Sequence, residues 1–146
     1  MATVYTTGYG GRTTEEVVKA VKAVNGVLVD IRFSPHSKQP NRDGFDFRRA
    51  MGDDEYVWLK HLGNKNYQGG PIELVDFERG VHYLDKILAT GHTAVLMCAC
   101  GRPDHCHRKV VGQLLQNIGF DVAELPYAPA PARPTPPTWS QDKLPF

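Results

Sequence analysis

All three cysteines of the chain lie within one short segment that also carries two of its six histidines. The segment runs from Cys98 to Arg108 and reads CACGRPDHCHR. The apolar run before it, residues 93–97, predicts a buried strand, and the apolar spacing over residues 110–118 predicts a helix. A loop between a strand and a helix suits a ligand, because the helix start offers unpaired N–H groups and the positive end of its dipole. The segment therefore predicts a chemical site.

One interpretation of the cysteine segment is a thiolate site. Cys106 lies near the expected helix start, beside His107 and Arg108, and each of these features lowers the pKa of a thiol and favours the nucleophilic form. In this interpretation Cys106 or Cys98 is the nucleophile, and His107 or Asp30 transfers protons. Arg108 and the loop amides would hold a phosphate or carboxylate group.

Two other interpretations of the same residues stay open. Zinc takes four nitrogen or sulfur ligands, and Cys98, Cys100 and Cys106 with one of His105 or His107 would supply them. The spacing of these residues is tighter than in common zinc knuckles. Alternatively, Cys98 and Cys100 are small buried hydrophobic residues at the end of a core strand, as free cysteine often is.

A glycine-rich turn follows the first expected strand, residues 3–7, and precedes a helix that opens with a capping box of Thr13 and Glu16. This position suits a turn whose backbone N–H groups approach a ligand closely. The candidate ligand-binding residues of the turn are Gly8, Tyr9 and Gly10. The turn lacks the G-x-G-x-x-G spacing of dinucleotide sites, so it predicts either a generic anion-binding turn or simply a tight connection.

Asp30 and Arg32 lie at the end of a second buried strand, predicted over residues 27–33. Side chains two positions apart share one face of a strand, and ligands of open α/β sheets bind at the carboxyl edge. Arg32, together with Ser34 and Arg108, is therefore a candidate for binding an anionic substrate. The alternative is an internal ion pair between Asp30 and Arg32 that fixes the long loop after the strand.

Basic and aromatic residues alternate in the segment that follows this strand. The basic residues are Lys38, Arg42, Arg48 and Arg49, and the aromatic ones are Phe33, Phe45 and Phe47. Such a mixture suits single-stranded nucleic acid, whose bases stack on aromatic rings. The more common explanation is a solvated basic face with the aromatic residues turned inward.

Strands and helices are expected to alternate along the chain. Strands are predicted near residues 3–7, 27–33, 56–59, 93–98 and 121–125, with helices near 13–24, 45–51, 77–88 and 110–118. This order predicts a single three-layer α/β domain over residues 1–125, with a mostly parallel, Rossmann-like sheet of four to five strands. Residues 126–146 hold seven of the eleven prolines and predict an extended tail that packs on the surface or on a partner.

Length and charge narrow the class of protein. The chain has 146 residues and a formal net charge of +1, so nothing global draws it to nucleic acid or to a membrane surface. No apolar run is long enough to span a bilayer, and the start of the chain lacks a signal-peptide pattern. The odd cysteine count argues against a disulfide framework and favours a reducing, cytoplasmic location. The oligomeric state is left open.

Several short motifs resemble the family called domain of unknown function 488. They are Thr6-Thr7-Gly8-Tyr9, Asp30-Ile31-Arg32-Phe33-Ser34-Pro35, the segment Tyr56–Gly63, and Cys106-His107-Arg108. The resemblance covers about residues 3–125. The last motif is the most specific. Many members carry a glutamate where this chain has Cys100, so acid–base chemistry at that position is not implied here. The resemblance implies the fold and the location of a site, but no reaction.

These observations lead to one functional expectation with two alternatives. We expect an enzyme that acts on a nucleotide or a nucleic-acid-derived anionic substrate through a cleft of cysteine, histidine and arginine residues, because the C-x-C…C-H pattern also resembles small nucleotide-handling Rossmann-like domains. The first alternative is a module that binds such ligands without catalysis. The second is an interaction domain stabilised by zinc.

Overall fold

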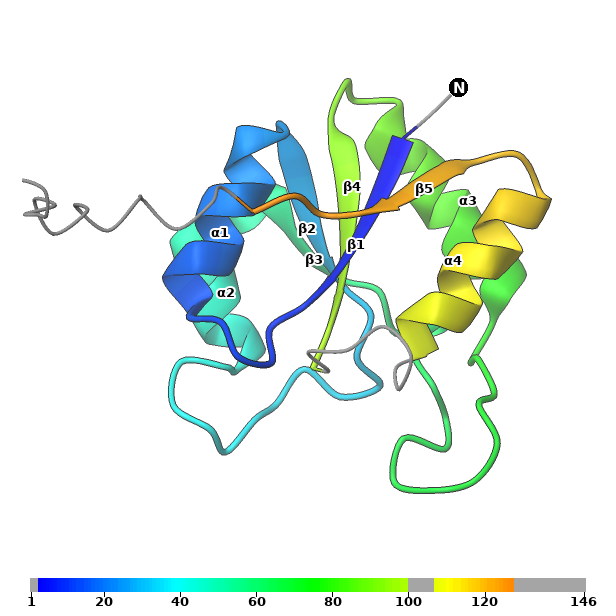
Figure 1. The fold of residues 1–146 in the computed structure, drawn as a ribbon, viewed down its shortest axis with the longest axis horizontal. Helices are drawn as coiled ribbons and strands as arrows, with labels where there is room; N and C mark the ends of the chain where they lie inside the picture. Colours follow the sequence, from blue (N-terminus) through cyan, green and yellow to red (C-terminus); the bar gives the residue numbers. More distant parts are fainter. Residues whose placement is uncertain (1–2, 100–106, 128–146) are drawn as a thin grey trace, which may run out of the picture.

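The computed structural model describes residues 3–99 and 107–127. Strands and helices alternate along them (Figure 1): β1 (Thr3–Gly8), α1 (Thr14–Ala23), β2 (Gly26–Asp30), α2 (Gly44–Met51), β3 (Tyr56–Trp58), α3 (Phe77–Leu88), β4 (Thr93–Cys98), α4 (His107–Asn117) and β5 (Asp121–Glu124). Two short 3₁₀ helices, η1 (Asp53–Glu55) and η2 (Lys60–Leu62), flank β3. Of the expected tail, only Pro126 and Tyr127 belong to the described residues.

The five strands form one sheet in the order β3-β2-β4-β1-β5, and every neighbouring pair is parallel. Helices α1 and α2 cover one face, and α3 and α4 cover the other (Figure 1). The predicted three-layer α/β fold with a parallel sheet is therefore confirmed. No helix of residues 3–99 and 107–127 is both long and apolar enough to cross a bilayer.

The central strands are buried because both of their faces are covered by helices. In β2, Val27 and Val29 pack toward α3 and α4, whereas Leu28 packs toward α1 and α2. This alternation has the two-residue period of a strand, although the sequence itself reads as a continuous apolar run. The two-residue period is therefore not visible in the sequence of β2, because both faces of the strand are buried.

Two element boundaries differ from those expected. β2 ends at Asp30. The backbone N–H of Ile31 still donates to the carbonyl of Met97 at 3.0 Å, but that of Arg32 donates to the side chain of Asp30 at 3.2 Å instead of to a neighbouring strand. Helix α4 already includes His107, whereas the apolar spacing suggested a start at Val110. The first turn of α4 consists of polar residues, so apolar spacing does not reveal it, although Arg108 in this turn is buried.

Helix α1 begins as predicted. Thr13 Oγ accepts a hydrogen bond from the backbone N–H of Glu16 at 3.0 Å, and Glu16 Oε1 accepts one from the backbone N–H of Thr13 at 2.8 Å. This reciprocal pair satisfies two N–H groups that the helix start would otherwise leave open. Asp43 and Asp46 form a second capping box at the start of α2, which holds the end of the long loop after β2.

Candidate functional site

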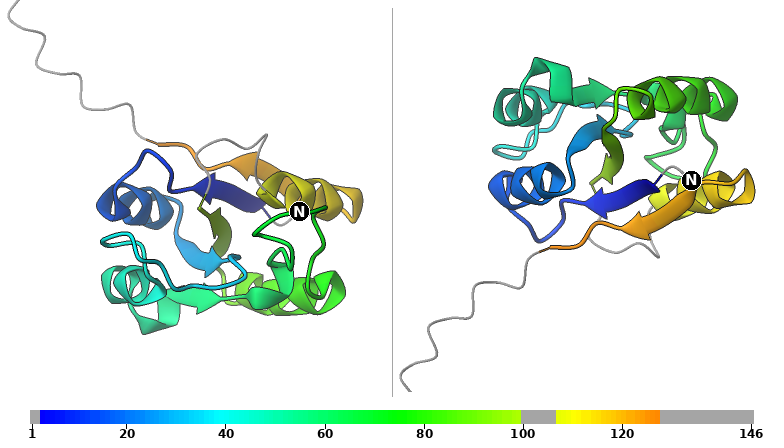
Figure 2. Two further views of the ribbon diagram at one scale, coloured as in Figure 1. Left: turned by 90° about the horizontal axis from the view of Figure 1, so that it is seen from below. Right: turned by 90° about the horizontal axis from the view of Figure 1, so that it is seen from above.

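The sheet topology creates a crevice at the carboxyl end of β4. The chain leaves β1 and β2 toward the face of α1 and α2, but it leaves β4, which lies between them, toward the face of α4 (Figures 1 and 2). Adjacent strands whose connections depart to opposite faces leave a gap outside their carboxyl ends, and ligands of such sheets bind there.

A cavity of about 510 Å³ occupies this end of the sheet. It is lined from β1 and its turn by Tyr9, from the loop after β2 by Arg32, Phe33, Ser34, His36 and Ser37, from the segment after η2 by Asn64, Asn66, Tyr67, Gly69, Gly70 and Ile72, and from β4 and α4 by Cys98, Ala99 and His107. Its volume lies in the range of small-molecule sites. Five of the predicted site residues therefore meet in one cavity: Tyr9, Arg32, Ser34, Cys98 and His107.

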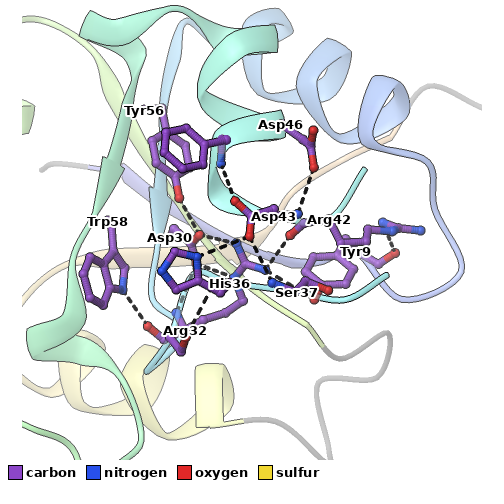
Figure 3. Close-up of polar contacts among 12 residues, drawn as sticks. Tyr9, Asp30, Arg32, His36, Ser37, Arg42, Asp43, Asp46, Tyr56 and Trp58 are labelled. Carbon is purple, nitrogen blue, oxygen red and sulfur yellow. Dashed lines mark hydrogen bonds and ion pairs between the residues drawn. The ribbon is translucent and has the colours of Figure 1, made fainter. Parts of the chain in front are cut away.

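Asp30 and Arg32 form a buried ion pair at the floor of this region (Figure 3). Asp30 Oδ1 accepts hydrogen bonds from Arg32 Nε at 2.8 Å and from the backbone N–H of Arg32 at 3.2 Å, and Oδ2 accepts one from Arg32 Nη2 at 2.5 Å. Asp30 is fully buried. Burial by itself would lower the pKa of Arg32, but the hydrogen bonds and charge of Asp30 outweigh it and raise this pKa above its ordinary value.

Tyr56 completes the carboxylate's hydrogen bonds. Its hydroxyl donates to Asp30 Oδ2 at 2.6 Å, and burial, followed by the charge of Asp30, raises the pKa of Tyr56. Trp58 Nε1 donates to the carbonyl of Arg32 at 2.9 Å. Because Asp30 is closed off from the cavity by its own partners, the structure favours the ion-pair interpretation of Asp30 over a proton-transfer role.

Arg42 ties the loop after β2 to the glycine-rich turn. Its Nη1 donates to the carbonyl of Tyr9 at 3.1 Å, its Nη2 donates to the carbonyl of Arg12, and its guanidinium lies 4.7 Å from the centre of the Tyr9 ring. Arg32 Nη1 in turn donates to the carbonyl of Arg42 at 2.7 Å. The side chain of Arg42 thus has a clear structural role, because it holds the glycine-rich turn against the loop after β2.

The other predicted basic residues lie on the surface of α2 or on the loop before it. Arg48 packs over the ring of Tyr56 at 5.1 Å, and Arg49 Nη1 lies 3.3 Å from Asp46 Oδ1. Lys38 is exposed. Contact with nucleic acid through these residues stays a prediction, in competition with the intramolecular contacts that Arg42, Arg48 and Arg49 already make.

Of the glycine-rich turn, only Tyr9 lines the cavity. The backbone N–H of Tyr9 donates to the carbonyl of Cys98 at 3.2 Å, and the backbone N–H of Arg12 donates to the carbonyl of Tyr9 at 2.9 Å. Gly8 belongs to β1, where it pairs with Cys98. Neither Gly8 nor Gly10 lines the cavity, so the structure favours a tight connection here over an anion-binding turn.

Cys98 ends β4 with its side chain buried against the cavity wall. It is 1% exposed, and it is disulfide-bonded in the structure, with its partner outside the described residues. The expectation that the chain holds no disulfide is therefore wrong for Cys98. The odd number of cysteines argues against a framework in which all are paired, but it leaves room for a single disulfide. The predicted roles of Cys100, His105 and Cys106 lie outside the described residues.

Arg108 does not reach the cavity. It is 1% exposed, its Nη2 lies 3.1 Å from Glu124 Oε1, and its Nη1 lies 3.8 Å from Cys98 Sγ. Glu124 also accepts a hydrogen bond from the hydroxyl of Thr6. Arg108 lines a separate hollow between α4 and β5. Arg32 and Arg108 thus serve two different places, and the expectation that both hold one anionic substrate finds no support in their positions.

His107 lies where α4 meets the cavity. Its Nε2 is 3.0 Å from the carbonyl oxygen of Ile31, a distance that suits a donated hydrogen bond. Burial lowers the pKa of His107, and hydrogen bonds to the carbonyls of Ile31 and Leu62 oppose this effect in part. The imidazole is therefore neutral near pH 7.

The lowered pKa of His107 predicts an acid-sensitive fold. As the pH falls below about 6.5, the unfolded chain takes up a proton before the folded one does, so the equilibrium moves toward unfolding. The stabilisation is fully present above that pH and is lost toward the pKa of the folded state. Urea unfolding between pH 7.5 and 5.5 should show this fall, and it should be smaller in His107→Gln. The exposed His82→Gln should behave like the original chain, and equal slopes in all three would contradict the prediction.

Sequence reasoning missed the segment between η2 and α3, which supplies much of one cavity wall. Asn64, Asn66 and Tyr67 contribute side chains there, and Gly69 and Gly70 contribute backbone. The segment has no apolar period, so it read as a plain loop. Its signal is the run of amide and aromatic residues followed by Gly-Gly-Pro, which predicts a tight turn that carries polar side chains.

A metal site is not apparent in the described part of the chain. Among residues 3–99 and 107–127, no three histidine, cysteine or acidic side chains gather as metal ligands would. Three of the candidate zinc ligands, Cys100, Cys106 and His105, lie outside those ranges. Zinc binding with Cys98 and His107 therefore stays a prediction.

Comparison with known proteins adds no assignment. The chain has no match among protein-family models, curated proteins or solved structures. The resemblance to the family called domain of unknown function 488 stays a prediction.

Proposed function

We propose that the chain is an enzyme that binds a nucleotide, or a related anionic compound derived from nucleic acid, in the cavity at the carboxyl end of β4. The observation that carries this proposal is the chemical character of the cavity wall. Its described side chains include one arginine, two histidines, two serines, two asparagines and three aromatic residues, and no carboxylate. Such a wall suits a ligand with negative charge and planar rings.

The anion would bind chiefly to donors of the loop after β2. Ser34, His36 and Ser37 of this loop all line the cavity. The His36 ring is 74% exposed, and its Nδ1 lies 3.4 Å from Asp43 Oδ1 (Figure 3). Arg32 adds positive charge to the same wall, but most of its N–H donors are already bonded to Asp30 and to the carbonyl of Arg42. We therefore assign the direct phosphate contact to His36 and the serines.

Catalysis would use the groups that β4 and α4 bring to the opposite wall. Once its disulfide is reduced, Cys98 offers a sulfur 3.8 Å from the guanidinium of Arg108, and a nearby cation stabilises a thiolate. His107 is neutral and lies on the same wall, the form in which an imidazole accepts a proton. Cys98 and His107 are the proposed reactive pair, and Cys106 stays a predicted nucleophile outside the described residues.

A recognition module without catalysis is the second candidate. The observation that favours it is the disulfide at Cys98, because a disulfide-bonded sulfur is no nucleophile. In that case the same cavity would bind its ligand and leave it unchanged.

Binding and turnover measured on one panel of ligands test this proposal. Nucleoside 5′-monophosphates should bind in calorimetric titrations, and His36→Ala should weaken their binding by about tenfold, since a hydrogen bond to a charged group contributes on the order of 1.5 kcal/mol. The matched control is His82→Ala on the exposed face of α3, which should bind as the original chain does. If neither phosphate nor any nucleotide binds, or if His36→Ala binds unchanged, the assigned site is wrong.

Chromatography of the same mixtures under reducing conditions shows whether the protein converts its ligand, and so distinguishes an enzyme from a recognition module. An enzyme converts at least one bound nucleotide, and Cys98→Ser should abolish the conversion while the affinity stays within about twofold. Binding with no conversion of any ligand, in reduced protein, would identify a recognition module.

A further inference from the structure

Asn64 presents a polar group to the cavity in one fixed orientation. The residue is 8% exposed and follows η2. Its Oδ1 accepts hydrogen bonds from the backbone N–H groups of Asn66 and Glu73, both at 3.0 Å. A backbone N–H can only donate, so the atom that faces these two groups must be the carboxamide oxygen rather than the nitrogen. The orientation of the amide follows from its partners.

The nitrogen of this carboxamide is consequently left on the side of the cavity. Asn64 lines that cavity, and among the described residues no protein acceptor faces its Nδ2. This nitrogen is open to solvent rather than buried, so its two N–H donors are available to an acceptor that enters the cavity. The natural partner is an acceptor atom of a ligand bound in the cavity.

The segment that carries Asn64 is held rigidly. The backbone N–H of Lys65 donates to the carbonyl of Glu73 at 2.7 Å, and that of Val75 donates to the carbonyl of Gly63 at 3.1 Å. Gly63 itself packs against the backbone of Phe33, where a Cβ would lie 3.0 Å from the Phe33 Cα. The donor of Asn64 is therefore preorganised, which favours selective recognition.

An aromatic surface lies beside this donor. Tyr67 stacks on Phe33 with ring centres 5.4 Å apart and planes 23° from parallel, and both residues line the cavity. Lys60 Nζ lies 4.4 Å from the centre of the Phe33 ring and helps to fix it. Tyr67 is 56% exposed, so part of its ring is open to a planar partner. Stacking on such a ring is favourable for every nucleobase.

We infer that Asn64 and Tyr67 form a base-recognition site that prefers nucleobases with a carbonyl oxygen, such as uracil and guanine, over adenine. An asparagine reads adenine with both ends of its carboxamide, oxygen to the N6 amino group and nitrogen to N7. The oxygen of Asn64 is already occupied twice, so it has no acceptor left for the amino group of adenine. Its nitrogen can donate to a carbonyl oxygen of uracil or guanine. At N7 of adenine the same nitrogen would lie beside the N6 amino group, for which Asn64 offers no acceptor. This inference rests on the proposed function and names the base that the cavity selects.

The ratio of affinities for uridine and adenosine 5′-monophosphates tests the inference. The original chain should favour the uridine compound by about tenfold or more, the range that a single base contact supports. Asn64→Asp keeps both backbone hydrogen bonds to Oδ1 but replaces the donor with an acceptor, so the ratio should fall to about one or invert. The added negative charge repels both phosphates equally and cancels in the ratio. Asn117→Asp, which adds the same charge at the far end of α4, is the matched control and should keep the original ratio.

Tyr67→Ala provides an independent measurement, because an exposed ring can be removed without unfolding the chain. It should weaken the binding of both nucleotides by about tenfold or more and leave ribose 5-phosphate unaffected. If Asn64→Asp weakens ribose 5-phosphate as much as the uridine compound and leaves the ratio unchanged, Asn64 contacts phosphate and the inference is wrong. Equal affinities in the original chain overturn the inference alone. Absence of all nucleotide binding overturns the proposed function and the inference with it.

Discussion

Replacing Asp30 with asparagine is expected to lower the free energy of unfolding by about 3–5 kcal/mol, the usual effect of removing one partner from a buried ion pair. The guanidinium of Arg32 would stay buried opposite a neutral amide, although it now has the carboxylate's two oxygens at 2.5–2.8 Å. The amide nitrogen would also face a donor, since Tyr56 gives its hydroxyl proton to Oδ2 at 2.6 Å. Urea unfolding at pH 7 measures the change.

Glu73→Gln is the matched control for this substitution. It neutralises the carboxylate of an ion pair with Lys65, in which both side chains are about half exposed. Such surface pairs contribute about 0–1 kcal/mol. If Asp30→Asn changed stability no more than Glu73→Gln does, the pair of Asp30 and Arg32 would not hold the floor of the cavity together.

Phe47→Ala is the second substitution with a large expected effect, a loss of about 3–5 kcal/mol. The side chain of Phe47 is fully buried, its ring centre lies 5.8 Å from that of Tyr9, and the guanidinium of Arg32 lies 5.7 Å from its ring. Its removal leaves a cavity and withdraws support from two residues that line the site. The urea midpoint should fall sharply, and ligand affinity should fall in the fraction that stays folded.

The chain offers a close control two positions earlier. Phe45 lies on the same helix, α2, but is 66% exposed. Phe45→Ala removes the same atoms from a place where they bury little surface, so its effect should lie within about 0.5 kcal/mol. Similar losses for the two variants would mean that α2 does not pack on the sheet through Phe47.

The fold was predictable because most of its helices and strands have signals in the local sequence. The capping box of Thr13 and Glu16, and the apolar runs of β2 and β4, depend on neighbours in sequence. The pairing of Asp30 with Arg32 was predicted as one alternative, although Arg32 lies beyond the end of β2 and reaches Asp30 through a turn of the backbone. Whether the pair binds a ligand was not predictable, because the answer depends on Tyr56, which arrives from another strand.

The parts of the site that escaped prediction depend on long-range contacts. Asn64 gained its fixed orientation only when the chain returned to place Glu73 beside it. The position of Arg108 near a helix start predicted an anion-binding residue, but its guanidinium forms an ion pair with Glu124 on β5. Likewise, nothing near His107 in sequence predicts the carbonyl of Ile31 as its partner.

The place of β1 in the sheet has a consequence for the order of folding. Its two neighbours are β4 and β5, so that Val4 pairs with Ala94 on one side and with Val122 on the other. During synthesis β1 is made before the other four strands, but it finds no partner strand until β4, which begins at Thr93, has left the ribosome. Pairings so distant in sequence are slow to form, and an unpaired strand is prone to aggregate until they do. Because Tyr9 leaves β1 and Cys98 ends β4, the cavity is among the last features to assemble, and a nascent chain would bind no ligand before β4 is complete.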